Sequence, residues 1–211
     1  KYMLTRNEFY IAVTLLAIAI STNAHDVRAS WVYNGRDDLV SSSSVGLFFR
    51  DLPVALRLNA EMTLRDIFAE VHEQVQNGIK YSCYPYNEIE APPVDDDDTC
   101  ILYQRDLRDV GDFGGLTVEE IEIRQNKAAS QTVLDIQILD GEAGLQYVLD
   151  YAASRYKKET MSEFQNLFKS VVAAIVNNAN TDGYEQRMQR GIRYGFLLQM
   201  QKIKDIFANR K

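Results

Sequence analysis

The feature that most constrains the fold of this chain is a long apolar run near its start, Phe9 to Ile20 in "FYIAVTLLAIAI". The run is well short of the roughly 20 residues that a helix needs to cross a bilayer. The stretch before it, "TRNE" from Thr5 to Glu8, has the pattern of a capping box, in which a hydroxyl and a carboxylate satisfy the free amides of a helix start. We therefore expect a buried helix that continues to about Ser21 and ends at Asn23.

The composition is that of a globular protein that can form one core. The chain has 211 residues, of which 46% are hydrophobic and 25% charged, and no linker divides it. Its net charge of −7 disfavours phosphate backbones and anionic lipid surfaces, so we expect neither nucleic acid nor a membrane as partner. The chain opens on Lys1 without the basic segment and cleavage site of a secretory signal, which suggests a fragment of a longer protein.

Residue types that carry chemistry are sparse. The two cysteines, Cys83 and Cys100, lack metal-type spacing, so we expect two unpaired thiols and a cytoplasmic location, with one disulfide as the alternative. Neither His25 nor His72 has a cysteine, serine or carboxylate at a recognisable catalytic or metal-binding spacing, and we expect His72 on a solvent-facing flank of its helix. The acidic run Asp95 to Asp98 favours a solvated loop over a metal site, because adjacent side chains of an extended loop point apart.

Two extended segments follow the first helix. Val27 to Arg36 is predicted as a half-buried strand, with apolar residues at every second position and an Asn-Gly pair that stops it. The segment Val45 to Leu58, "VGLFFRDLPVALRL", is apolar on both faces, which predicts an interior strand covered on both sides. Pro53 cannot donate to the ladder, so it is expected to bend this strand or to lie at a bulge.

The remaining elements alternate between helical and extended patterns, which predicts an α/β fold with a mixed sheet flanked by helices. We divide the chain into a domain of residues 1–180 and a basic amphipathic tail of residues 181–211, able to bind a partner or to pack on its own domain. The other expected elements are a helix from a cap at Thr63, an exposed loop through Asp98, strands at Cys100–Gln104 and Val118–Ile123, a hairpin that turns at Asp140–Gly144, and a helix opened by a capping box at Thr160–Glu163.

Three motifs in order resemble the second half of a condensation domain from nonribosomal peptide synthetases. They are "YNGR" from Tyr33 to Arg36, the Val45–Leu58 segment, and "YSCYPYNEI" from Tyr81 to Ile89. In that family they correspond to a GR step, a strand of the form VGxFvNTLPxR and an HQDYPFE-like segment. The hairpin and the last helix are similar to the closing part of the same family, so the resemblance covers roughly Thr5 to Asn178.

The chain also departs from the family pattern. Arg50-Asp51 stands where the family has Asn-Thr, Tyr81 and Cys83 replace the histidine and aspartate of the third motif, and the acidic loop replaces an RDxSRNPLF-like stretch. The HHxxxDG motif of the first lobe is absent. The resemblance therefore implies one lobe, the C-terminal lobe, of the two-lobed chloramphenicol acetyltransferase-like fold, which would not catalyse alone.

By resemblance, the site residues would line a cleft between the two lobes. Arg36 would form an ion pair with the aspartate of HHxxxDG across the cleft, because a buried guanidinium needs a carboxylate. Since strand neighbours point to opposite faces, at most one of Arg50 and Asp51 would face the tunnel. The candidates for the cleft and substrate tunnel are Arg36, Phe48, Arg50, Asp51, Pro53, Tyr81 and Tyr84.

The family's reaction is attack of an acceptor amine on a donor thioester, without a metal or a directly bound cofactor. The phosphopantetheine arms of carrier proteins would be the substrates, and the partners would be peptidyl carrier proteins and the N-terminal condensation lobe. Two alternatives stay open: a coenzyme A-dependent acyltransferase of the same fold, and a non-catalytic condensation-like module that recruits partner enzymes. The altered motifs at Arg50-Asp51 and Tyr81–Asn87 favour the second.

Overall fold

The computed structural model describes residues 4–36, 44–59, 62–84, 99–105, 114–116, 133–141 and 144–179. The predictions for the loop at 85–98, the strand at 118–123 and the tail at 181–211 lie outside these residues. The described elements confirm the α/β prediction. In chain order they are α1 (Arg6–Thr22), β1 (Asp26–Tyr33), β2 (Arg50–Arg57), α2 (Leu64–Lys80), β3 (Thr99–Arg105), β4 (Leu134–Gly141), β5 (Gly144–Tyr151) and α3 (Lys158–Ala179).

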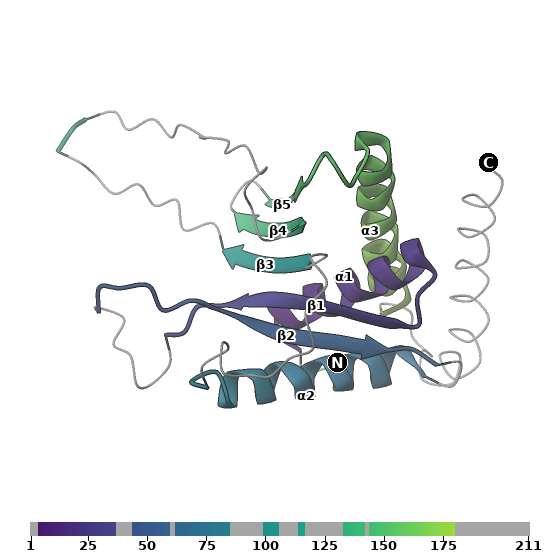
Figure 1. The fold of residues 1–211 in the computed structure, drawn as a ribbon, viewed down its shortest axis with the longest axis horizontal. Coiled ribbons are helices and arrows are strands. Elements are labelled where there is room, and N and C mark those ends of the chain that lie inside the picture. The colour runs from purple at the N-terminus through teal and green to yellow at the C-terminus, as the bar shows by residue number, and fades with distance from the viewer. Residues whose placement is uncertain are drawn as a thin grey trace.

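The described strands form one mixed sheet in the order β2-β1-β3-β4-β5 (Figure 1). The inner strands β1, β3 and β4 are parallel, and the outer strands β2 and β5 run antiparallel to their neighbours. The predicted hairpin is present, because β4 and β5 pair from Leu134–Tyr151 to Gly141–Gly144. In Figure 1, α2 runs alongside β2 at one side of the sheet and α3 stands near β5 at the other.

The apolar run forms the most deeply buried helix, as predicted. Every side chain of α1 from Ile11 to Ala17 is inaccessible to solvent, because α1 packs against α2, α3, β1 and β3. Its start has the predicted capping box, in which the Thr5 Oγ accepts from the Glu8 N–H at 3.2 Å and Glu8 accepts from the Thr5 N–H at 2.7 Å. Its end is the predicted Asn23, which adopts the left-handed conformation (φ 56°) that asparagine tolerates at a helix terminus.

One face of the sheet supplies most of the strands' share of the core. The register aligns a row of apolar side chains across all the described strands, and the same row joins one core cluster with α1, α2 and α3. Apolar side chains that share one face of every strand are expected for a sheet buried on that face, because side chains alternate between the two faces along each strand. The row consists of Leu52, Trp31, Ile101, Ile136 and Leu149.

The prediction of an interior strand over Val45–Leu58 is wrong. Strand β2 begins only at Arg50, and among the described strands it is an edge strand that pairs with β1 alone. Leu52, Val54 and Leu56 are buried, whereas the positions between them are exposed or half-buried. The apolar residues before Arg50 extended the run in the sequence, but they lie in an exposed segment that belongs to no strand.

Pro53 neither bends the strand nor lies at a bulge. The β1–β2 register is unbroken from Asp26–Arg57 to Tyr33–Arg50, with Pro53 directly opposite Ser30. A proline is compatible with this place because β2 is an edge strand, and the backbone position that lacks an N–H can point away from the neighbouring strand.

The predicted capping box at Thr160–Glu163 is also wrong, because α3 starts at Lys158 and includes Thr160 in its first turn. The helix begins earlier because a turn precedes it directly. In that turn the N–H groups of Arg155 and Tyr156 both donate to the Ala152 carbonyl, at 2.9 and 3.0 Å. The helix nevertheless buries an apolar side: Phe164, Leu167, Phe168, Val171 and Ile175 are buried, and Val172 is partly buried against them.

The predictions for one further helix, one further strand and the two cysteines are borne out. The helix capped by Thr63 is α2, where Thr63 and Asp66 form a reciprocal box, and β3 matches the strand expected at Cys100–Gln104. Both cysteines are free thiols, Cys83 exposed and Cys100 buried. Across the described ranges, none of the helices combines the length and hydropathy of a membrane span.

Candidate functional site

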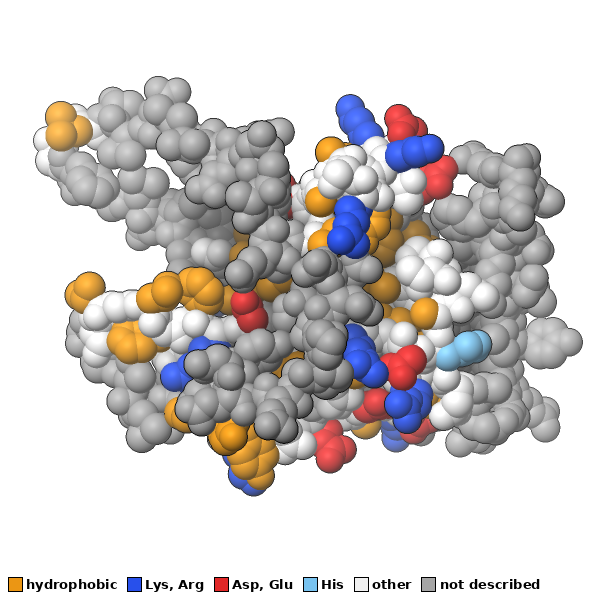
Figure 2. Space-filling model, viewed as in Figure 1, with side chains coloured by type: hydrophobic (Ala, Val, Ile, Leu, Met, Phe, Trp, Pro, Cys, Tyr) orange, Lys and Arg blue, Asp and Glu red, His pale blue; other side chains and the backbone are white. Residues whose placement is uncertain are grey.

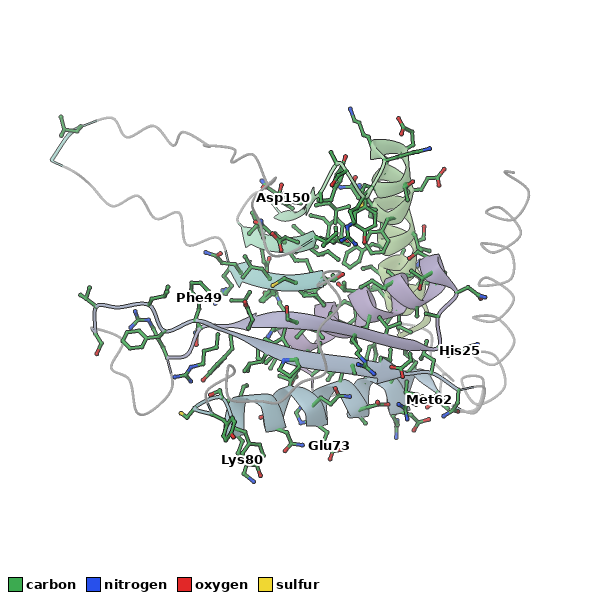
Figure 3. The ribbon with its side chains drawn as sticks, viewed as in Figure 1. His25, Phe49, Met62, Glu73, Lys80 and Asp150 are labelled. Carbon is green, nitrogen blue, oxygen red and sulfur yellow. The ribbon has the colours of Figure 1, made fainter. Side chains whose placement is uncertain are left out.

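Most of the predicted site residues lie at one end of the sheet. The carboxyl ends of β1, β3 and β4 share this end because the three strands are parallel, and β2 begins there because it is antiparallel to β1. Figure 3 shows Phe49 and Lys80 toward this end, with His25 and Met62 at the opposite end. In open α/β sheets, ligands bind outside the carboxyl ends of the strands, so this end is the candidate site.

Arg36 is bound within its own loop. Its guanidinium donates to the carbonyls of Ser44 at 2.9 Å and Gly46 at 3.4 Å, and its Cζ lies 4.6 Å from the centre of the Phe48 ring. Gly35 makes this close approach possible, because it has φ +66° and a Cβ there would lie 1.8 Å from the Phe48 carbonyl oxygen. The glycine and arginine of the "YNGR" motif thus fold the two sides of this loop together.

Arg50 connects the first residue of β2 to the turn after α2. Its guanidinium donates to the buried Ser82 Oγ at 3.2 Å and lies 3.9 Å from the Cys83 sulfur. Sequence reasoning found Arg50 but missed Ser82, since the small hydroxyl stood out in no motif. The contact gives Arg50 a positioning role between the second and third motifs.

The turn after α2 presents two aromatic rings to solvent. Tyr81 ends the helix, and its carbonyl accepts from the Tyr84 N–H at 3.0 Å. The two side chains are 63% and 59% exposed, and the ammonium of Lys80 lies 5.0 Å from the centre of the Tyr81 ring. The turn is therefore held by its own backbone and by Arg50, while its aromatic rings remain available for contact.

Exposed apolar side chains occur at this end in two segments, residues 45–49 before β2 and residues 81–84 after α2. We call these exposed side chains the sheet-end surface. Figure 2 shows apolar side chains gathered toward this end of the molecule, beside residues coloured grey. Large exposed apolar surfaces mark interaction sites when they form patches. The members of the sheet-end surface are Val45 (100% exposed), Leu47 (79%), Phe49 (53%), Tyr81 and Tyr84.

Asp51 and Pro53 lie elsewhere than the rest of the predicted set. Both alternate with the buried Leu52 and are exposed, so their side chains lie on the face of β2 opposite the core. Phe48 contacts Arg36 and is half-buried. The structure thus brings Arg36 together with Phe48, and Arg50 with the turn of Tyr81 and Tyr84, whereas Asp51 and Pro53 lie on the outer face of β2.

A second polar group lies where β3 and β4 end near the start of α1. The Tyr103 hydroxyl donates to Asp140 at 2.8 Å, Arg6 forms an ion pair with the same carboxylate, and Tyr10 stacks on Tyr103 with ring centres 5.5 Å apart. Hydrogen bonds from Tyr103 and Arg6 lower the pKa of Asp140, and burial together with the bond to Asp140 raises the pKa of Tyr103. This group ties the N-terminus of α1 to the sheet.

His72 lies on a solvent-facing flank of α2, as expected. Its ring is half exposed, but Nδ1 lies 2.8 Å from a carboxylate oxygen of the buried Glu8, which is distant in sequence. Gln76 donates to the same carboxylate at 3.0 Å. Burial raises the pKa of Glu8, but hydrogen bonds from Thr5, Gln76 and His72 outweigh it, so the pKa is lowered overall. The capping box could have indicated Glu8, but nothing local in the sequence indicated its partners on α2.

Over the ranges that the structure describes, no three His, Cys, Asp or Glu side chains are grouped as a metal site. The acidic run at 95–98 lies outside those ranges. The described residues at this end of the sheet thus offer aromatic and apolar side chains for contact. The guanidinium groups of Arg36 and Arg50 beside them are already hydrogen-bonded.

A family model described as "Condensation domain" matches residues 1–188. Bacitracin synthase 3 of Bacillus licheniformis is 23% identical over 166 residues, which cover 69% of this chain and 3% of that protein. The fold is similar to a mutant of the starter condensation domain of rhizomide synthetase (TM-score 0.67, 16% identity, 83% of this chain and 42% of that one). It is also similar to the epimerization domain of the third module of tyrocidine synthetase B (TM-score 0.64, 16% identity, the same coverage).

The chain spans less than half the length of these condensation and epimerization domains and a small part of the synthase. It also matches 15% of a four-domain nonribosomal peptide synthetase, with 86% of this chain covered, a TM-score of 0.66 and 14% identity. The described elements therefore correspond to one part of a larger architecture.

Proposed function

The chain belongs to the condensation-domain family, and from this premise we propose that it is the C-terminal, acceptor-side lobe of a nonribosomal peptide synthetase condensation domain. The observation that carries the proposal is the sheet-end surface. Several large apolar side chains exposed at one end suit contact with another part of the protein, and the chain covers 42% of a similar domain, so the proposal has the other lobe contact this surface.

The reaction of the complete domain would join two carrier-bound thioesters. The amine nitrogen of the acceptor attacks the thioester carbonyl carbon of the donor, a C–N bond forms and the C–S bond breaks. The amine proton leaves and the donor thiol is released protonated. The phosphopantetheine arms are substrates here, and the base or positioning histidine would come from the other lobe.

This lobe would supply one wall of the substrate tunnel. Tyr81 and Tyr84 can contact an extended pantetheine arm, because aromatic rings present apolar area at little conformational cost. Arg50 would act on the tunnel indirectly, by fixing the turn through Ser82. Arg36 donates hydrogen bonds to backbone carbonyls in this structure. Its predicted ion pair with the first lobe would therefore require the guanidinium to change partners.

The first experiment is peptide mapping by mass spectrometry of the native polypeptide. We expect sequence upstream of Lys1 that includes HHxxxDG, and amide synthesis by that polypeptide with carrier-bound substrates. A native chain that begins at Lys1, and that forms no amide when mixed with first lobes of the family, would overturn the proposal.

A second candidate is a non-catalytic module that recruits partner enzymes. It is favoured by one observation, namely that Arg50, which replaces a family asparagine, is engaged by Ser82 and Cys83. This candidate predicts that the native polypeptide binds a partner synthetase through the sheet-end surface without amide synthesis.

A further inference from the structure

Among the described strands, β2 has no neighbour on its outer edge, and a glutamine from α2 is hydrogen-bonded to this edge. The Gln74 side chain accepts from the Ala55 N–H at 2.8 Å and donates to the Ala55 carbonyl at 2.7 Å. These are the two backbone groups that an added strand would use at this position. Helix α2 lies alongside β2 in Figure 1, so the amide reaches the edge from the neighbouring element.

Pro53 faces the same free edge. The Leu58 N–H donates to the His25 carbonyl at 2.7 Å, so the even-numbered residues of β2 direct their backbone groups to β1. The odd-numbered residues then direct theirs outward, as Ala55 does. Two successive outward positions therefore offer no free backbone N–H to an added strand. Pro53 has no N–H, and the N–H of Ala55 already donates to Gln74.

The other edge of the sheet has a weaker version of the same arrangement. On β5 the Tyr147 carbonyl accepts from the Gln165 side chain of α3 at 3.3 Å. Here one backbone group is engaged by a longer contact, whereas on β2 two groups are engaged by short contacts. The closure of β2 is thus the more complete of the two.

We propose that Gln74 acts together with Pro53 as an edge lock, which keeps β2 from pairing with β2 of a second copy of this chain. Unpaired edges of apolar strands are templates for association, and proteins close them with prolines, charges or covering groups. The inference rests on the sheet and is independent of the proposed condensation function.

The test replaces Gln74 with Met, which has similar length and no amide. We expect hydrogen exchange of the Ala55 amide to become about fivefold faster, as loss of one hydrogen bond of ordinary strength implies. The double variant Gln74→Met/Pro53→Val adds an outward N–H, and we expect it to form a concentration-dependent dimer in light scattering after gel filtration. Glu73→Met, on an exposed position of the same helix, is the matched control and should stay monomeric.

A double variant that is folded by circular dichroism and stays monomeric over the concentrations tested would overturn the lock. Dimers formed equally by Glu73→Met would overturn it too, because they would come from added surface hydrophobicity. If the Met variants do not fold, Gln74→Ser replaces them. The serine side chain is too short to reach the Ala55 backbone, so faster exchange of the Ala55 amide is expected, and unchanged exchange would overturn the proposal.

Discussion

The buried start of α1 and the sheet-end surface differ in the solvent exposure and the pairing of their side chains. At the start of α1, the Glu8 carboxylate is 1% exposed and receives hydrogen bonds from Thr5, His72 and Gln76. At the sheet end, the rings of Phe49 and Tyr81 are mostly in solvent. A buried charge with all its partners in one chain serves the folding of that chain. Exposed aromatic area serves contact with something outside it.

The largest expected effect on stability comes from Glu8→Ala, which removes the hydrogen-bonded carboxylate at the start of α1. The substitution removes a buried carboxylate that accepts hydrogen bonds from Thr5, His72 and Gln76, so we expect the free energy of unfolding to fall by about 3 kcal/mol. Urea denaturation can be followed by the fluorescence of Trp31, the one tryptophan of the chain, which lies in the core. Glu73→Ala removes an exposed carboxylate from α2 and should change the free energy by less than about 0.5 kcal/mol. Equal losses for both variants would contradict the distinction.

A second, smaller effect is the dependence of stability on pH. Because the pKa of Glu8 is lowered in the folded protein from its ordinary 4.5, the unfolded chain binds the proton more readily. The stabilisation is present above the unfolded pKa and is lost as pH falls through the folded pKa. We therefore expect the free energy of unfolding to decrease from about pH 5 to about pH 3, and to decrease less steeply in Glu8→Gln.

Asp66 and Asp140 also have lowered pKa values, so the slope of the parent protein contains their contributions. The difference between the slopes of Glu8→Gln and the parent isolates Glu8. Parallel slopes would show that the carboxylate of Glu8 is not held in its charged form.

A third change tests whether the interior of α1 is as well satisfied as its start. Thr14 is fully buried, and its hydroxyl has no hydrogen-bond partner in the structure. Thr14→Val keeps the branched shape and removes the unpaired hydroxyl, so we expect stabilisation by about 1 kcal/mol in urea denaturation. A loss of stability would mean that the hydroxyl is bonded in solution.

Local signals in the sequence predicted the first region well and the second poorly. The capping box at Thr5, the αL residue Asn23 and the apolar run between them depend on near neighbours, and all are confirmed. The contact of Glu8 with His72 depends on the packing of α1 against α2, and no local spacing encodes it.

The segment Val45–Leu58 shows why apolar pattern alone failed at the sheet end. A continuous apolar run is typical of a strand buried on both faces. Here the run combines an exposed segment, residues 45–49, with an edge strand that alternates in burial from Arg50. The family resemblance did predict that Arg50 and Tyr81 lie at the same end of the lobe. The order of motifs along the chain carries information about distant contacts, and periodicity does not.

The smallest expected effect on stability, and the sharpest contrast with Glu8, comes from Phe49→Ser. Its ring is 53% exposed, so we expect the free energy of unfolding to change by less than about 0.5 kcal/mol. If the sheet-end surface contacts the first lobe as proposed, amide synthesis by the native polypeptide should nevertheless fall at least about tenfold, since loss of one buried aromatic anchor at an interface costs about 2 kcal/mol. Val176→Ser, an exposed apolar position on α3, is the matched control and should retain activity. Full activity in Phe49→Ser with unchanged stability would separate this surface from the reaction, because a residue that supports neither folding nor turnover has no part in the contact between lobes.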